Sequence, residues 1–373
     1  MTRRRGWFSV GAVGAAFALS IGSAHAAGGW AASPATGVTG PVSSFSDTDA
    51  WALGSSGFAH WNGSGWTQFA APAGLGTMRA IADDGANNAW AVGAVSSGYR
   101  IVTLQIAHWN GTAWSISANL PVSARFAALS GVTALSPSNV WAVGSDGQHG
   151  LVEHFDGTSW SQTTVPDPNA GTFYGSTLTA VSARSASDVW AVGTFANPAP
   201  APDSLYALHY DGAAWHVVTM AQTGSLTNSN SPVPSSVVDI GAGDVWMVGS
   251  QADFGSPTTL TEHWNGTAWS IVASPFDHIP ASANSISDGS LAAVTARASN
   301  DVWAAGFDFT FTDGDPSGIY HALLIHWNGT SWTQDTTAPT TGTYNTVLGI
   351  TSTLGGHVIW ATNAGTPGLL THA

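Results

Sequence analysis

The stretch Asp188-Val-Trp-Ala-Val-Gly193, followed by His209-Tyr-Asp-Gly-Ala-Ala-Trp215, decides the fold of this chain because both motifs recur. In six copies of the first motif, an acidic or amide residue stands two positions before a Trp. Each copy is followed by a His, an aromatic residue and Asn-Gly or Asp-Gly, with a further Trp three residues after the Gly. Repeats of this length are typical of folds that use one small unit many times. The tryptophans of the first motif, about 40 to 57 residues apart, are Trp51, Trp90, Trp141, Trp190, Trp246 and Trp303.

Each repeat has room for four short strands. In the unit quoted above, we place them over 178–183, 188–193, 205–210 and 214–220. The Asp-Gly pair between the last two is a strong hairpin signal, because these residues tolerate the positive φ angles of a tight turn. Helix signatures are absent. Seven such units predict an all-β fold, a seven-bladed β-propeller with four antiparallel strands per blade.

The seventh unit predicts how the ring closes. Its degenerate first motif, around Trp360, is followed by residues 369–373 where the other units continue into Asn-Gly-Thr-x-Trp. Near the N-terminus, the segment 28–34 around Trp30 matches that missing piece. We therefore expect the N-terminal strand to complete the last blade, which removes the exposed sheet edge that an open ring would leave.

Composition narrows the classes of function. The chain has no Cys, so a disulfide framework, a Cys-ligated metal and a thiol nucleophile are excluded. Only 8% of its 373 residues are charged and the formal net charge is −14, which makes DNA, RNA and anionic membrane surfaces poor partners. No long apolar run follows the N-terminal segment, so we expect no membrane span. We also expect a monomer.

Residues 1–26 have the three parts of an export signal. Residues 3–5 are all Arg, residues 8–21 are largely apolar, and residues 24–26 read Ala-His-Ala, a small-x-small cleavage site. General secretory export and twin-arginine export are both compatible with this segment. The sequence thus predicts a secreted protein in which a single propeller domain occupies residues 27–373.

The two motifs also carry a family resemblance. The D-V-W-A-V-G and H-W-N-G-T-x-W repeats, which extend over essentially all of residues 28–373, resemble those of secreted bacterial seven-bladed β-propellers. The Asn-Gly-Thr-x-Trp turn is also similar to a shortened Asp box of sialidase-like propellers, although the leading Ser-x-Asp-x-Gly is missing. The resemblance implies a fold that serves many functions, glycan binding in lectin-like members among them.

We interpret the repeated His and Trp residues mainly as structural. In the first unit, a turn of two Ser residues places Trp51 opposite His60, so we expect the His to pack on the Trp and bond a nearby Asp. A ring of metal-binding or catalytic His is disfavoured because these His residues belong to different blades. Large Trp side chains are expected to fill the wedges between blades. For four of them, near the hairpin turns, the alternative is stacking on sugars: Trp61, Trp109, Trp264 and Trp327.

Candidate binding residues are expected where the repeats differ. The loops between second and third strands and the loops between successive units share one rim of a propeller, and loops on a rigid scaffold commonly carry ligand sites. For each candidate, a solvated loop residue is the simpler alternative. The candidate ligand-binding residues on this rim are Tyr99, Arg100, His149, Tyr174, Tyr206, His278 and Tyr320.

One loop resembles part of a calcium site. Asp313-Gly-Asp315-Pro-Ser317-Gly318 matches the first half of a calcium loop, in which oxygen ligands accompany a sharp Gly turn. The twelfth position of that loop is Leu324 in place of the bidentate Glu. Two alternatives therefore remain for this loop: calcium bound by Asp313, Asp315 and Ser317, or a polar surface turn. No other cofactor is expected.

Three functions remain open from the sequence. The leading hypothesis is an exported, non-catalytic binding module for carbohydrate or cell-envelope polymers, based on the export signal, the near-identical blades and the many aromatic residues. The second is a polysaccharide lyase or hydrolase whose His, Tyr and Arg converge in the top central cavity, which requires a base within hydrogen-bond reach. The third is an extracellular scaffold for protein interactions. The absence of a nucleophile elbow, a phosphate loop and a His-Glu-x-x-His motif favours a non-catalytic role.

Overall fold

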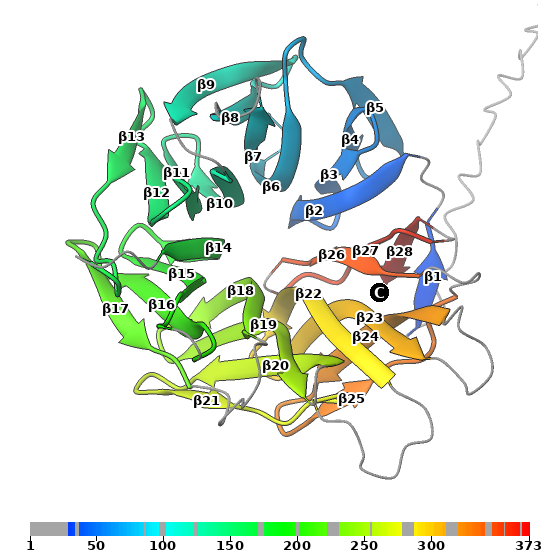
Figure 1. Cartoon of the computed structure of the whole chain (residues 1–373). Helices are drawn as coiled ribbons and strands as arrows, with labels where there is room; N and C mark the ends of the chain where they lie inside the picture. The colour runs from blue at the N-terminus through cyan, green and yellow to red at the C-terminus, as the bar shows by residue number, and fades with distance from the viewer. Residues whose placement is uncertain are drawn as a thin grey trace, which may run out of the picture.

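In a computed structural model, the chain forms seven four-stranded antiparallel sheets arranged in a ring (Figure 1). The residues that the structure describes contain no helix, and the arrangement of their strands confirms the predicted seven-bladed β-propeller. The export signal predicted over 1–26 lies outside the described residues. The structure describes residues 29–33, 37–85, 87–96, 102–122, 126–170, 175–198, 201–221, 231–253, 256–277, 287–310, 319–339, 345–353, 355–365 and 368–373.

Each blade extends outward from its first strand at the centre of the ring to its fourth strand at the periphery (Figure 1). From centre to periphery, the strands are, in blade 1, β2 (Val38–Ser46), β3 (Asp49–Gly54), β4 (Gly57–Trp61) and β5 (Trp66–Ala70); in blade 2, β6 (Thr77–Gly85), β7 (Asn88–Ser96), β8 (Val102–Trp109) and β9 (Trp114–Val122); in blade 3, β10 (Ala128–Ser136), β11 (Asn139–Ser145), β12 (Gly150–Phe155) and β13 (Trp160–Thr163); in blade 4, β14 (Ser176–Ser185), β15 (Asp188–Phe195), β16 (Ser204–Tyr210) and β17 (Trp215–Thr219). The remaining strands are, in blade 5, β18 (Val233–Gly241), β19 (Asp244–Asp253), β20 (Ser256–Trp264) and β21 (Trp269–Ile271); in blade 6, β22 (Ser287–Ala298), β23 (Asp301–Thr310), β24 (Ile319–Trp327) and β25 (Trp332–Gln334); and in blade 7, β26 (Val347–Thr351), β27 (Ile359–Asn363), β28 (Leu369–His372) and β1 (Trp30–Ala32).

The register predicted for blade 1 is confirmed. A two-residue turn joins β3 to β4, with Gly54 opposite Gly57 and Trp51 directly opposite His60. Because side chains alternate between the two faces of a strand, this pairing puts the Trp and the His on the same face. The same pairing of Trp with His occurs in blade 4, between Trp190 and His209.

The hydrophobic core consists of layers between adjacent blades. In one layer, Trp190 and Val192 of blade 4 pack with Val245 and Met247 of blade 5, and all four side chains are almost fully buried. Both faces of a blade contact a neighbour, so the middle strands are apolar on both sides and the polar residues are left for the turns. This explains how a chain with 8% charged residues folds as a compact ring.

The N-terminal strand closes the ring, as predicted. β1 pairs with β28 in antiparallel register, with Trp30 opposite His372. The Trp30 side chain is 6% exposed and meets Trp303 of blade 6 with ring centroids 5.6 Å apart. The outer strand of blade 7 therefore comes from one end of the chain and its other three strands from the other end.

The antiparallel order of the strands separates two rims of the ring. The repeated rim carries the turns between the first and second strands and between the third and fourth strands, such as Asp211-Gly212. The variable rim carries the turns between the second and third strands, such as Ser55-Ser56, and the connections from one blade to the next. Of the variable-loop candidates, His149, Tyr206 and Tyr320 lie within the described residues and belong to this second rim.

Candidate functional site

On the repeated rim, the repeated His contacts two side chains of its own blade, a Trp and an Asp or Asn. In blade 4, His209 stacks on Trp190 with ring centroids 4.3 Å apart, and its Nε2 donates to Asp188 Oδ1 at 2.9 Å. Six blades contain this arrangement, with Asn in place of Asp in two of them. Each His is thus engaged within its own blade, which confirms the structural interpretation of these residues.

The turns of the repeated rim are fixed by hydrogen bonds between a side chain and the backbone. In blade 4, Asp211 Oδ1 accepts hydrogen bonds from the backbone N–H groups of Ala213 and Ala214, each 2.9 Å long. These backbone hydrogen bonds lower the pKa of Asp211 to about 2. Gly212 has a φ of 94°, and a Cβ at this position would lie 2.7 Å from the Cβ of Ser187. The Asp-Gly and Asn-Gly pairs are therefore explained by turn geometry.

The four tryptophans considered for sugar stacking pack between blades. Trp264 of blade 5 contacts Trp190 of blade 4 with ring centroids 5.2 Å apart, and Trp327 contacts Trp246 in the same way at 4.8 Å. Trp61 contacts Trp360 of blade 7, and Trp109, which is 5% exposed, contacts Trp51 of blade 1. Trp61, Trp264 and Trp327 are half-buried. Sugar stacking at these rings stays a prediction.

Two candidates from the variable rim come together between blades 3 and 4. His149 lies with Nδ1 3.8 Å from Asp146 Oδ2 and with Nε2 3.8 Å from Asp167 Oδ2. Tyr206 is 2% exposed, and burial raises the pKa of its hydroxyl. A Cβ on Gly150, the residue after His149, would lie 2.7 Å from the Tyr206 hydroxyl oxygen. The sequence placed both residues on one rim without indicating that they are neighbours.

The other candidates are not part of this group. Tyr320 lies in β24 and packs against Phe307 and Phe309 of blade 6. Within the described ranges, no group of three or more His, Asp or Glu side chains is arranged to hold a metal ion. The predicted positions that lie outside the described residues are Tyr99, Arg100, Tyr174, His278, Asp313, Asp315 and Ser317.

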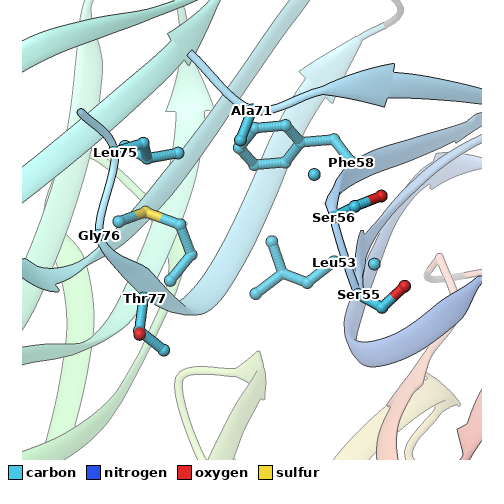
Figure 2. A pocket seen from close by; sticks show the side chains of 11 residues that line it. Leu53, Ser55, Ser56, Phe58, Ala71, Leu75, Gly76 and Thr77 are labelled. Atoms are coloured by element: carbon cyan, nitrogen blue, oxygen red, sulfur yellow. The ribbon is translucent and has the colours of Figure 1, made fainter. Parts of the chain in front are cut away.

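A notch lies between blades 1 and 2 on the variable rim. It has a volume of about 350 Å³ and carries no charged side chain among its lining residues. Its floor is rigid, because Phe58 is 1% exposed and stacks on Trp114 of blade 2 with ring centroids 3.7 Å apart. Figure 2 shows the two sides of the notch, which are formed by Leu53, Ser55, Ser56 and Phe58 on one side and Leu75, Gly76 and Thr77 on the other.

The notch exists because blade 1 is shorter than its neighbour at this rim. β3 ends three residues after Trp51, whereas β7 continues six residues past Trp90. The connection into blade 2 is anchored by Gln105, which accepts a hydrogen bond from Gly76 N at 2.7 Å and donates to Gly74 O at 3.2 Å. The sequence contains a signal for this site, the Ser-Ser turn of blade 1, but reasoning from chemically reactive residues missed it.

A second cavity, of about 440 Å³, lies between blades 2 and 3. Leu104, Leu151 and Trp160 are among its apolar lining residues, and the carboxyl groups of Glu153 and Asp146 share it. Glu153 is 5% exposed, and burial raises its pKa to about 7. A carboxyl group that is half protonated near neutral pH is suited to donate a proton.

Comparison with known proteins supports the architecture. Searches with the sequence match no family model and no curated protein. Among solved structures, the chain is similar to YCF48 bound to a D1 peptide, with 15% identity, a TM-score of 0.53 and coverage of 92% of this chain and 93% of that one. It is also similar to an ulvan lyase of polysaccharide lyase family PL25 bound to a GlcA(1-4)Rha3S glycan, with 10% identity, a TM-score of 0.52 and coverage of 92% and 94%.

These similarities show a shared β-propeller fold. At 10–15% identity they show the fold alone, and the chemistry of each site depends on this chain's own residues. Within the part of the chain that the structure describes, no helix is long and apolar enough to cross a membrane.

Proposed function

We propose that the protein is an exported, non-catalytic binding module whose ligand is an uncharged segment of a carbohydrate or cell-envelope polymer, bound in the notch between blades 1 and 2. The observation that carries this proposal is the chemistry of the notch. Its lining has apolar side chains below, hydroxyl groups at its edge and no acid or base. A site without a titratable side chain is suited to binding and offers no group for proton transfer.

The chemistry of sugars matches this lining. A sugar ring has apolar C–H faces and polar hydroxyl edges, so it is complemented by an apolar surface bordered by hydrogen-bonding groups. Leu75 and Met78, which are partly exposed, supply the apolar surface, and Ser55, Ser56 and Thr77 supply hydroxyl groups. The volume, about 350 Å³, is within the range of about 300–1,000 Å³ that ligand pockets usually have.

A glycan array probed with the purified protein tests this function. We expect binding to one or more neutral glycans and a loss of at least tenfold in affinity for Ser56→Trp, whose indole would fill the notch. Ser64→Trp is the matched control, since Ser64 is an exposed residue in a turn of the same blade on the repeated rim. A blank array, or equal binding by Ser56→Trp and wild type, would contradict the proposal.

The cavity between blades 2 and 3 favours one second candidate, a glycoside hydrolase. There Glu153, with its pKa of about 7, would protonate the leaving glycosidic oxygen while the Asp146 carboxylate takes a proton from the attacking water. This candidate predicts new reducing ends when glycans that bind on the array are incubated with the protein. It also predicts that Glu153→Gln abolishes their release and leaves binding intact. Unchanged glycans after prolonged incubation would exclude it.

A further inference from the structure

The innermost strands line a central channel in a regular way. Each of these strands has a β-bulge, a position at which the strand holds one extra residue, or two in β2. The strands that surround the centre of the ring are β2, β6, β10, β14, β18, β22 and β26 (Figure 1). The bulged residues line a cavity of about 260 Å³ between these strands. In order around the channel, beginning with blade 1, these residues are Pro41, Arg79, Ser130, Thr179, Ser235, Ala292 and Leu348.

The bulged residues are polar on one side of the channel and apolar on the other. Blades 2 to 5 contribute one guanidinium and three hydroxyl groups in succession, whereas blades 6, 7 and 1 contribute Ala292, Leu348 and Pro41. The Thr179 hydroxyl donates to Val192 O at 3.2 Å and keeps its capacity to accept. Among the bulged residues, hydrogen-bonding groups are thus separated from aliphatic groups, while Ile81, Val132, Val181 and Val237 of blades 2 to 5 also line the cavity.

Arg79 is the single titratable side chain among the described residues that line this channel. It is exposed to the channel, and it forms no hydrogen bond or ion pair with any residue in the described ranges. The Ser130 hydroxyl of the neighbouring blade is likewise unbonded there. In a chain with a formal net charge of −14, an unpaired cation that shares a channel with an open hydroxyl is the exception, and the group that ordinarily complements it is an anion.

We propose that the central channel binds a small organic carboxylate, with its carboxylate on Arg79 and Ser130 and its apolar body against Leu348 and Ala292. Guanidinium is planar and presents two parallel N–H donors, which match the two oxygens of a carboxylate. Leu348 and Ala292 offer an aliphatic surface in the same cavity, so we expect the ligand to carry an apolar body as well as a carboxylate. This site is separate from the notch and goes beyond the proposed function.

Calorimetric titration with benzoate and benzamide tests the site. These probes share an aromatic ring and differ in charge, so we expect the wild type to bind benzoate and to bind benzamide at least tenfold more weakly. Arg79→Gln should lose benzoate binding by at least tenfold. Arg184→Gln is the matched control, since it also removes one positive charge but lies at the repeated rim, where Arg184 pairs with Asp188 at 2.6 Å. Equal binding of benzoate by wild type and Arg79→Gln, or no benzoate binding at all, would overturn the proposal.

A second variant keeps the cation and blocks the site. Leu348→Asp places a carboxylate in the same channel, two blades from Arg79, at a position that is 37% exposed and therefore tolerant of a polar side chain. This variant should also abolish benzoate binding, and a folded variant that binds benzoate as the wild type does would contradict the placement of the apolar body.

The source of the carboxylate is distinguished by a peptide arm. A neutral hexapeptide with a free C-terminal carboxylate is titrated beside the same peptide with a C-terminal amide. If the free peptide binds at least tenfold more tightly than benzoate and the amide does not, the carboxylate is a chain end. If benzoate binds as well as the peptide, the ligand is a free small acid.

Discussion

The two rims of the propeller differ in what their side chains contact. On the repeated rim, His209 stacks on Trp190 and bonds Asp188, and six blades share this arrangement. On the variable rim, each junction between blades has its own chemistry, an uncharged notch between blades 1 and 2 and a group around His149 between blades 3 and 4. Repetition in this sequence therefore reports packing, and a binding site is to be sought where one blade departs from the others.

The largest expected effect comes from breaking the repeated rim. Trp190→Ala removes a ring that is 1% exposed and that contacts His209, Trp264 and Trp269. A cavity of this size should lower the free energy of unfolding by about 3–5 kcal/mol, measured by urea denaturation. Ser56→Ala on the variable rim serves as the control and should change it by less than about 0.5 kcal/mol. A loss below about 1 kcal/mol for Trp190→Ala would contradict the packing role.

The sequence predicts the repeated rim well for a physical reason. A β-strand alternates its side chains strictly, so the spacing of Trp51, the Ser-Ser turn and His60 determines their pairing without knowledge of the neighbouring blades. The closure by Trp30 follows in the same way, from a match between local motifs.

The sites on the variable rim and in the channel could be predicted only in part. The notch depends on how far β7 extends beyond β3, and the proximity of His149 to Asp167 depends on two connections of different blades. The position of Arg79 in the channel depends on a bulge in β6, which shifts its side chain by one place relative to simple alternation. Strand lengths, connections between blades and bulges cannot be read from the spacing of the repeated motifs.

A smaller effect on stability is expected from Glu262, a buried carboxyl group in β20 of blade 5. Glu262 precedes the repeated His of blade 5, is fully buried, and accepts a hydrogen bond from Ala221 N at 3.0 Å. Burial raises the pKa of Glu262 to about 8 from its ordinary 4.5. The folded protein therefore holds this proton more tightly than the unfolded chain does. The resulting stability is fully present below about pH 4.5 and is lost as the pH rises through about 8.

Glu262→Gln should flatten that dependence. Between pH 5 and pH 8 we expect the free energy of unfolding of the wild type to fall more steeply than that of the variant, by up to about 1.4 kcal/mol per pH unit. Urea denaturation at pH 5, 6, 7 and 8 measures the two slopes. Asp211→Asn is the control, since the pKa of Asp211 is lowered to about 2 and its titration lies outside this window. Parallel slopes for wild type and Glu262→Gln would contradict the burial of a titrating carboxyl here.

The hydrogen bond of the repeated rim has an effect of about 1–2 kcal/mol. His209→Phe keeps an aromatic ring on Trp190 and removes the donor to Asp188 Oδ1. The cost is limited because Asp188 Oδ2 still accepts from Arg184 at 2.6 Å. Urea denaturation of His209→Phe, Asp188→Asn and the double variant measures the coupling between the two residues. Strictly additive losses would show that the His acts through stacking alone.

The smallest effect on stability is expected at the turn that forms the notch. Inserting Gly-Ser-Gly between Ser55 and Ser56 lengthens a surface turn, and loop-closure entropy grows slowly with length, so the free energy of unfolding should change by about 0.5 kcal/mol or less. The same insertion after Gly212 separates Asp211 from the backbone N–H groups of Ala213 and Ala214, which it binds at 2.9 Å, and should cost more. Glycan binding should show the reverse order, with loss for the insertion at the notch and retention for the insertion on the repeated rim. If both insertions were equally tolerated for stability and for binding, the separation of packing on one rim from recognition on the other would not hold, because each rim would then contribute to both.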